Sequence, residues 1–440
     1  MTVDYREMKR RRKELMAQME PNSIAIVAAA TPKTRNNDAE YPYRQSSDFY
    51  YLTGFVEQQA VLALMPGRKQ GEVVLFCQEK DKLKELWNGV LMGPALASKE
   101  LLIDDAFPIS DINEIIPGLI EGRERVYYSM GSDPQFDQQV MDWVNVVRSH
   151  KGLGVHPPGE FLVLDHLLHE QRLVKSREEI RLMEKAAKIS ARAHKRAMQV
   201  CKPGVHEYEL EAEMLHEFYR NGSRSPAYNS IVAAGNNACI LHYDTNNAQV
   251  KDGDLVLIDA GCEYQHYASD ITRTFPANGT FSAEQRAIYD IVLKANLAAI
   301  EAVKPGVPYD ESHNISVRVI TSGLIKLGLI KGTPGKAIKE QIYRDFYMHK
   351  VGHWLGMDVH DVGDYRIDGS WRLLEPGMVT TIEPGIYIAP DNRKVASKWR
   401  GIGVRIEDDV LVTRGGHKVL SNDVPKAADE IEALMAGKLH

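Results

Sequence analysis

The sequence predicts an α/β protein of two domains, and three observations lead to this prediction. The chain has 440 residues, well above the roughly 150 residues of one ordinary domain. Short apolar runs bounded by turn residues, typical of buried strands, alternate with helical patterns in both halves. The pattern becomes irregular at "SHKGLGVHPPGE", residues 149–160, as expected of a connection. We therefore expect one domain over residues 1–172 and a second over residues 173–440.

The first domain opens with a predicted helix and continues with buried strands. Residues 5–19, "YREMKRRRKELMAQM", place Met8, Leu15 and Met19 near one helical face, with cations elsewhere. The basic run is therefore interpreted as the solvated side of this helix. The apolar runs "SIAIVAAA" and "EVVLFCQ" follow as strands with helical patterns between them. These features favour an α/β arrangement for the first domain.

The second domain opens with a long helical pattern at "SREEIRLMEKAAKISARAHKRAMQV". Its start has a physical reason, because Ser176 followed by Glu179 has the spacing of a capping box. Further on, "GDLVLIDAG" (253–261) aligns with "GMVTTIEPG" (377–385), and in both segments a strand is expected to end in a carboxylate. Helices precede both segments, which favours an internal repeat.

Each copy of this repeat contains two acids. Asp259 and Glu383 end the first strands, and the second strands follow in "YASDITRTF" with Asp270 and in "GVRIEDDVLV" with Glu407. Any one of these acids alone can be a turn or surface residue. Together they stand directly beside apolar strand interiors, where an unpaired charge is costly. Two related hairpins would therefore bring four carboxylates close to one axis.

Converging carboxylates repel one another unless a positive charge neutralises them, and a pair of divalent ions does so. An oxygen-rich site with one or two imidazoles suits Mn²⁺, and Co²⁺, Fe²⁺ and Zn²⁺ are also possible. Two such ions can hold a bridging hydroxide and polarise a carbonyl, which is the chemistry of metal-assisted hydrolysis. The sequence contains no GxxxxGK[ST] motif and no G-x-G-x-x-G after a strand, so a nucleotide site is not expected.

Composition excludes other classes of protein. The net charge is -6 and the pI is about 6.2, so the chain lacks the cationic surface of a nucleic-acid-binding protein. No segment approaches the roughly 20 apolar residues of a membrane span, and the first residues lack the apolar region of a signal peptide. The four cysteines are widely scattered, as in proteins of a reducing compartment. We expect a cytoplasmic protein with no nucleic-acid or membrane partner.

Five motifs in order resemble the dinuclear site of the pita-bread metallopeptidases, a family that includes aminopeptidase P, prolidase and methionine aminopeptidase. They are "IDAG", "SDITRTF", "HKVGHWLGMDVHD", "TIEPGIY" and "GVRIEDD". In addition, "EYPYRQSSDFYYLTGF" (40–55) resembles the N-terminal domain of aminopeptidase P, so the likeness spans nearly the whole chain. The resemblance implies an N-terminal α/β domain for oligomerisation and active-site cover. It also implies a C-terminal pita-bread domain with a pseudo-two-fold repeat.

The resemblance implies a role for each ligand of two ions, most often Mn²⁺. Asp259 would chelate one ion, Asp270 and Glu407 would bridge both, and His353 with Glu383 would complete the other shell. The bridging hydroxide would attack the scissile carbonyl. Glu383 would also carry a proton to the departing nitrogen, which needs one because the bond before proline releases a secondary amine.

Other positions match residues around the family's site. His242, in "CILHY", and His360 would hydrogen-bond the substrate carbonyl or the developing oxyanion, although an exposed loop histidine is the alternative for His242. Arg405 would support the acidic ligands, unless it is an exposed strand cation. His349 would border the proline pocket.

Three further candidates for substrate binding are aromatic. Tyr228 and Tyr387 are candidates whose alternative is simple packing. Trp87, in "ELWNG", matches a tryptophan that in the family reaches the active site of a neighbouring subunit, which implies a homo-oligomer, either a dimer or a tetramer. Lys350 departs from the family pattern, where a small residue is common, and we expect it to face outward or to contact another segment.

The activity implied by the resemblance is that of a manganese-dependent Xaa-Pro aminopeptidase. It would remove the N-terminal residue from peptides whose second residue is proline. An Xaa-Pro dipeptidase, or prolidase, uses the same chemistry with a pocket closed to longer chains and remains open as an alternative. A non-catalytic pita-bread binding protein is disfavoured, because such proteins usually lose ligands and all five are present here.

Overall fold

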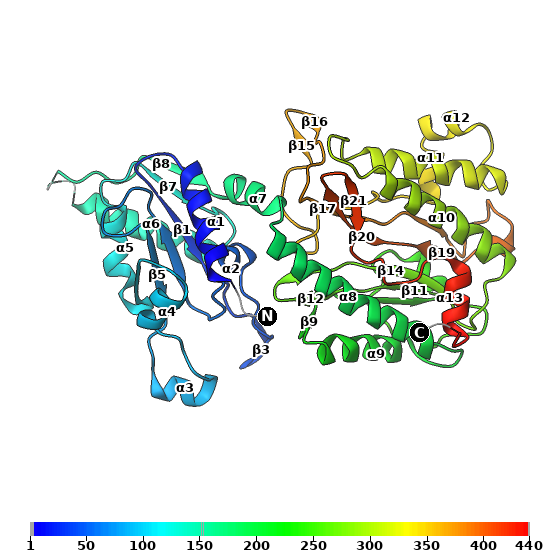
Figure 1. Ribbon diagram of the computed structural model, residues 1–440, viewed down its shortest axis with the longest axis horizontal. Coiled ribbons are helices and arrows are strands. Elements are labelled where there is room, and N and C mark those ends of the chain that lie inside the picture. Colours follow the sequence, from blue (N-terminus) through cyan, green and yellow to red (C-terminus); the bar gives the residue numbers. More distant parts are fainter. Residues whose placement is uncertain (1–3, 151, 153, 439–440) are drawn as a thin grey trace. The chain divides into compact units, whose positions relative to one another are not determined.

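The computed structural model describes residues 4–150, 152 and 154–438. The chain folds into two compact units, Met1–Gln171 and Arg172–His440, and the division falls inside α7 (Asp165–Leu173). Both units mix helices with strands (Figure 1), which confirms the predicted α/β class. Within the described residues, no helix has both the length and the apolar character that a membrane span requires.

The N-terminal unit is built on one mixed sheet. The strands of this unit are β1 (Ser23–Ala28), β2 (Thr34–Asn36), β3 (Ala39–Glu40), β4 (Val61–Leu64), β5 (Val73–Cys77), β6 (Asp105–Pro108), β7 (Arg125–Tyr128) and β8 (Glu160–Val163), of which β2 and β3 pair only with each other. Its helices are α1 (Tyr5–Gln18), α2 (Ser47–Thr53), α3 (Lys82–Asn88), α4 (Pro94–Glu100), α5 (Ile112–Ile120) and α6 (Pro134–Ser149). Six strands form a sheet in the order β6-β5-β4-β1-β7-β8, and a hydrophobic core lies between this sheet and helices α5 and α6. The two apolar runs predicted as strands are β1 and β5.

Helix α1 corrects the interpretation of the basic run. Met8 and Leu15 are buried as expected, but Arg11 and Arg12 are also buried, with 2% and 1% of their surface exposed. The Arg12 guanidinium donates hydrogen bonds to the backbone carbonyls of Leu52, Leu101 and Leu102. Carbonyls at the ends of helices lack partners within the helix, and a long cationic side chain can supply them. The prediction that the basic run is solvated was therefore wrong for Arg11 and Arg12.

The C-terminal unit contains two pairs of packed helices followed by strands (Figure 1). Its helices are α8 (Arg177–Val200), α9 (Glu207–Arg220), α10 (Ala283–Glu301), α11 (Glu311–Lys326), α12 (Pro334–Lys339) and α13 (Ala428–Met435). The strands of its first half are β9 (Ser225–Pro226), β10 (Ile231–Ala234), β11 (Leu255–Asp259), β12 (Cys262–Tyr264), β13 (Tyr267–Ala268) and β14 (Thr272–Pro276). Those of its second half are β15 (Arg366–Ile367), β16 (Ser370–Trp371), β17 (Val379–Ile382), β18 (Gly385–Ile388), β19 (Ile402–Arg405), β20 (Asp408–Thr413) and β21 (Gly416–Val419). The capping box predicted at Ser176 starts α8.

The two halves of this unit use the same strand pairing. Strand β11 pairs antiparallel with β14, and β17 pairs antiparallel with β20. In the first pair Asp259 lies opposite Thr272, two residues after Asp270. In the second pair Ile382, the residue before Glu383, lies opposite Asp408, the residue after Glu407. Each half therefore places one acid at the end of a strand and another just before the partner strand begins, as the aligned segments predicted.

Two glycines allow these segments to pack closely. A Cβ on Gly261 would lie 1.7 Å from the carbonyl oxygen of Ser269, and a Cβ on Gly352 would lie 1.9 Å from that of Thr381. No side chain can occupy either space, since both obstacles are backbone atoms. The segments that carry Asp270 and His353 therefore lie as close to their neighbours as glycine permits.

Candidate metal centre

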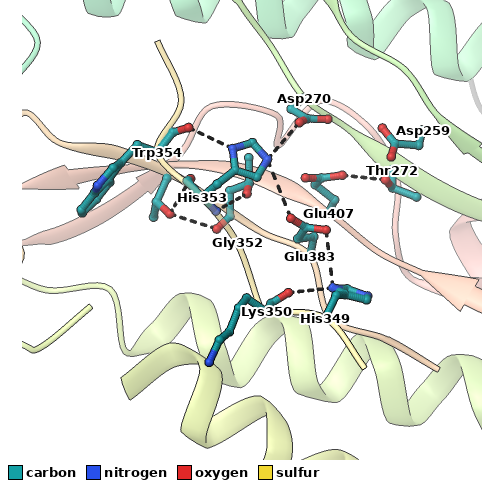
Figure 2. A network of polar contacts seen from close by, with 12 residues as sticks. Asp259, Asp270, Thr272, His349, Lys350, Gly352, His353, Trp354, Glu383 and Glu407 are labelled. Atoms are coloured by element: carbon teal, nitrogen blue, oxygen red, sulfur yellow. Dashed lines mark hydrogen bonds and ion pairs between the residues drawn. The ribbon is translucent and has the colours of Figure 1, made fainter. Parts of the chain in front are cut away.

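The five predicted ligands converge on one cavity of about 500 Å³ in the C-terminal unit. Figure 2 shows the side chains of Asp259, Asp270, Glu383, Glu407 and His353 directed toward one another from separate segments. His353 Nε2 lies 3.3 Å from Asp270 Oδ2 and 3.8 Å from Glu383 Oε1. One ligand atom each from Asp270, His353 and Glu407 lie within 4.8 Å of one another. This spacing is compatible with a shared metal ion.

Strand β17 holds His353 in place. The His353 backbone N–H donates to Thr381 Oγ1 at 3.0 Å, and its carbonyl accepts from the Thr381 N–H at 2.9 Å. The ring Nδ1 lies 2.9 Å from the carbonyl oxygen of Trp354 (Figure 2). That oxygen can only accept, so Nδ1 carries a proton and Nε2 is the atom left to face the carboxylates.

This tautomer provides a test of whether a cation fits the site. A neutral His353 would point its Nε2 lone pair at the carboxylate of Asp270, which is unfavourable unless a proton or a metal ion lies between them. In the protein alone a proton takes this place: burial lowers the pKa of His353, but the hydrogen bond and charge of Asp270 outweigh it and raise the pKa to about 9. Four carboxylates and one imidazole nitrogen form a donor set that suits divalent ions such as Mn²⁺. The residues present therefore fit a divalent metal ion.

The carboxylates themselves also favour a cation. Burial raises the pKa of Glu383 to about 7. Burial, together with the charge of Asp270, raises the pKa of Glu407 well above its ordinary value. Burial likewise raises the pKa of Asp259. These acids therefore tend to keep their protons until another positive charge replaces them.

Arg405 is the buried cation of the cluster, with 4% of its surface exposed. Its Nη2 donates to Asp259 Oδ2 at 2.5 Å, and its Nε donates to Thr272 Oγ1 at 3.2 Å. The Thr272 hydroxyl in turn donates to Glu407 Oε2 at 2.6 Å. Arg405 is thus connected to both halves of the site and is not the exposed strand cation considered as the alternative.

Tyr228 lies between two of the acids. Its hydroxyl is 2.6 Å from Asp259 Oδ1 and 2.5 Å from Asp270 Oδ1. Burial, followed by the charges of Asp259 and Asp270, raises the pKa of Tyr228 well above its ordinary value. The phenol therefore stays protonated and donates its one proton to one of these carboxylates at a time, so Tyr228 does more than pack against its neighbours.

His349 belongs to a chain of hydrogen bonds that starts at Arg405. Arg405 Nη1 donates to the Tyr387 hydroxyl at 3.0 Å, the hydroxyl donates to His349 Nε2 at 2.9 Å, and His349 Nδ1 donates to the Lys350 carbonyl at 2.7 Å. Burial and the charge of Arg405 lower the pKa of His349 to about 4. His349 is therefore neutral and lines the cavity, whereas Tyr387 is buried behind it with 2% of its surface exposed.

Two other predicted histidines line the same cavity, and one predicted residue lies elsewhere. The rings of His360 and His353 meet edge to face with centroids 4.2 Å apart. His242 is exposed on the wall of the cavity, in the loop after β10. Trp87 lies on α3 in the N-terminal unit, where 84% of its surface is exposed.

The side chains that support these ligands were not predicted from the sequence. Asp408 and Asp409, which follow Glu407 directly, are buried with 0% and 1% of their surface exposed. Asp408 pairs with Arg273 at 2.8 Å and with Lys426 at 2.6 Å. Asp409 Oδ1 accepts the backbone N–H of Asp270 at 3.1 Å. The apolar run "VLVT" directly after these acids was the signal in the sequence that they face inward.

Glu207, the second residue of "HEYEL", was also not among the predicted site residues. Its carboxylate is fully buried and accepts hydrogen bonds from four donors in the segment 234–248. The donors are Ala234 N and Asn237 Nδ2 on one oxygen, at 2.8 and 3.0 Å, and Tyr243 Oη and Ala248 N on the other, both at 2.8 Å. This segment carries His242, so Glu207 sets the path of the loop that places it.

Glu207→Gln is expected to lower kcat/KM about tenfold while leaving the metal content unchanged. The amide nitrogen of glutamine would face at least one backbone N–H, and a buried donor without a partner costs about 1–3 kcal/mol. Glu209→Gln, on the exposed first turn of the same helix, is the matched control and should behave as wild type. Equal activity of the two variants would contradict the positioning of His242 by Glu207.

Comparison with known proteins gives consistent matches along the chain. Residues 181–414 match the model of metallopeptidase family M24, and residues 8–127 match that of the aminopeptidase P N-terminal domain. The Xaa-Pro aminopeptidase of Escherichia coli strain K12 is 46% identical over 434 residues, 98% of this chain and 98% of that protein. A solved aminopeptidase structure from Pseudomonas aeruginosa is 62% identical, with a TM-score of 0.98 and 99% coverage of both chains. A zinc-substituted E. coli aminopeptidase P in complex with product is 46% identical, with a TM-score of 0.97 and 100% coverage of both chains.

Proposed function

The chain belongs to metallopeptidase family M24, and we propose that it is a metal-dependent Xaa-Pro aminopeptidase. Its substrates are peptides with proline in the second position, from which it releases the N-terminal residue. The observation that carries this proposal is the convergence of one histidine and four acids on a single cavity. Two divalent ions, when bound there, would activate water and polarise the scissile carbonyl.

The remaining roles follow from where each side chain lies. Glu383, whose pKa burial raises to about 7, is suited to accept a proton and to return it to the departing nitrogen of proline. His360 and His242 lie on the cavity wall, where they can donate hydrogen bonds to the carbonyl oxygen of the substrate. Neutral His349, which the Tyr387 hydroxyl holds by a hydrogen bond, borders the position of the proline ring. Arg405 offsets the negative charge of the acids.

Peptide length is the test of this function. The enzyme should release glycine from Gly-Pro-Gly-Gly, and it should leave Gly-Ala-Gly-Gly largely intact. An Xaa-Pro dipeptidase would instead cleave Gly-Pro and spare the tetrapeptide. Cleavage confined to the dipeptide would therefore replace the aminopeptidase assignment with the prolidase alternative.

Manganese is the proposed metal, on the grounds that oxygen ligands predominate in the donor set. Metal binding is expected to release protons, and its apparent affinity should rise with pH up to about 9. In the metal-free protein His353 is protonated below a pKa of about 9 and Glu383 below about 7, and both must lose that proton to bind an ion. Lower pH therefore opposes binding.

Calorimetric titration of the metal-free protein with Mn²⁺ measures this release. The observed heat at pH 7 should differ between two buffers of different ionisation enthalpy, and the affinity should weaken from pH 8 to pH 6. Identical heats in the two buffers, or an affinity that does not change with pH, would mean that these groups are not the ligands.

A homo-oligomer in which Trp87 serves a neighbouring subunit is the proposed assembly. Helix α3 exposes a group of large apolar side chains that a lone chain leaves in water: Leu83, Leu86, Trp87 and, just after the helix, Val90. Contiguous exposed apolar surface of this kind is typical of protein interfaces.

All four cysteines are free, which supports the proposed cytoplasmic location, where thiols stay reduced.

Mixing two variants with reduced or no activity tests this assembly. Trp87→Ala is expected to lower activity about tenfold or more, and Asp270→Ala to be inactive. Oligomers re-formed from a mixture of the two should regain activity, because a Trp87→Ala chain has an intact metal site and the other chain supplies the tryptophan. Activity no higher than the average of the separate variants, or a protein that is monomeric by light scattering, would contradict the proposal.

A further inference from the structure

A second cavity, of about 390 Å³, adjoins the metal cavity in the C-terminal unit. The two cavities share Lys350 and Gly352 as lining residues. The walls of the second cavity are mainly aromatic, from Tyr309, Tyr365 and Trp371. Such a surface accepts a flat apolar group and leaves little to orient a polar one. The roles proposed above use none of these aromatic side chains.

Lys350 connects the two cavities. Figure 2 shows its ammonium nitrogen directed away from the carboxylates of the metal site. The nitrogen instead lies 5.9 Å from the ring centroid of Trp371, close to the outer limit of a cation–π contact. This placement agrees with the expectation that Lys350 faces outward or contacts another segment. It leaves an exposed cation at the junction of the two cavities.

The charges around the second cavity favour an anionic group near its entrance. The Arg366 guanidinium also lies over the Trp371 ring, with its Cζ 4.2 Å from the ring centroid. Among the described residues of the lining, Asp310 carries the one carboxylate, which accepts a hydrogen bond from the side chain of Asn314 at 3.0 Å. His313 also lines the cavity, and burial lowers its pKa to about 4, so it is neutral at pH 7. The lining therefore carries two cations, Lys350 and Arg366, and one carboxylate, that of Asp310.

We infer that this second cavity is a substrate subsite that binds an aromatic side chain directly after the proline, while Lys350 pairs with the carboxylate that follows it. The inference rests on the proposed function, since it places the peptide in the metal cavity with its C-terminal part continuing past Gly352. Aromatic rings match the walls, and a peptide carboxylate matches the cation at the junction. Among tripeptides, Xaa-Pro-Phe with a free C-terminus combines both features.

Three peptides separate these contributions in steady-state kinetics: Ala-Pro-Phe, its C-terminal amide and Ala-Pro-Gly. The wild-type enzyme should prefer Ala-Pro-Phe over Ala-Pro-Gly by about tenfold in kcat/KM, since much of a phenylalanine side chain becomes buried. It should also prefer the free acid over the amide. Lys350→Met should remove the preference for the free acid, and Trp371→Ala should remove the preference for phenylalanine.

Lys398→Met is the matched control, because Lys398 is also an exposed cation over a tryptophan, 5.0 Å from the ring centroid of Trp399. It should keep both wild-type preferences. Each preference is a ratio of two substrates measured on one preparation, so partial unfolding of a variant cancels. If Lys350→Met and Trp371→Ala both keep the wild-type ratios, the proposed subsite is wrong and the proposed function still stands. A wild-type enzyme that cleaves none of the three peptides would overturn the proposed function with it.

Discussion

Replacing Asp270 with alanine is expected to abolish peptidase activity and to lower the metal content of the purified protein. Asp270 is the acid closest to His353, and its backbone and side chain also bind Asp409 and Tyr228. Loss of a residue that only supports a metal ligand typically costs 10–100-fold in activity or affinity. Loss of a proposed metal ligand itself should therefore cost more than about 100-fold, measured as kcat/KM and as metal per chain by elemental analysis.

Asp391→Ala is the control for this experiment, because Asp391 is an exposed acid in the turn after β18. It should retain wild-type activity and metal. Circular dichroism should show that the Asp270→Ala protein is folded, since alanine leaves no buried charge at that position. Activity that survives in a folded Asp270→Ala enzyme would show that the reaction does not depend on the metal cluster.

Glu383→Gln is expected to lower kcat by about 10²–10⁴-fold, which is the range that a general acid–base contributes. The glutamine side chain keeps an oxygen that can bind a cation but cannot accept and return a proton. Metal content should therefore fall much less than activity does. The separation between the two measurements distinguishes a proton carrier from a residue that only binds the ion.

The sequence offers a close control for Glu383. Glu375 stands in the same local sequence, Glu-Pro-Gly, eight residues earlier, but its side chain is exposed. Glu375→Gln should leave kcat and metal content as in wild type. A kcat for Glu383→Gln within about threefold of that control would assign the proton transfer to another group.

The architecture of the candidate site was predictable because strand pairing repeats a simple pattern. An apolar run that ends in an acid, as before Asp259 and Glu383, places that acid at the end of a strand, and antiparallel pairing brings a second acid beside it. His353 could be identified as a metal ligand only through the likeness to a known family. Packing of its segment against β17 brings it to the acids, and its distance from them in the sequence does not indicate this. Its tautomer depends on the carbonyl of Trp354, which no sequence pattern indicates.

Buried charges outside the ligand set, such as Arg12 and Glu207, could not be predicted from the sequence. Arg12 is buried because three carbonyls from distant segments need donors, and Glu207 is buried because the segment 234–248 folds over it. In both cases the partners lie tens of residues away, while the local pattern is that of an ordinary amphipathic helix. The aromatic partner of Lys350 was likewise not predictable, since Trp371 lies in the hairpin of β15 and β16.

The most direct test of the central claim is a metal titration of the stripped enzyme, followed by the release of glycine from Gly-Pro-Gly-Gly. Chelator-treated protein should be inactive, and activity should return as Mn²⁺ is added, reaching its maximum at two ions per chain. This result would establish that the cluster of Asp259, Asp270, His353, Glu383 and Glu407 works as a dinuclear centre. Full activity in protein shown to be free of metal would contradict the account.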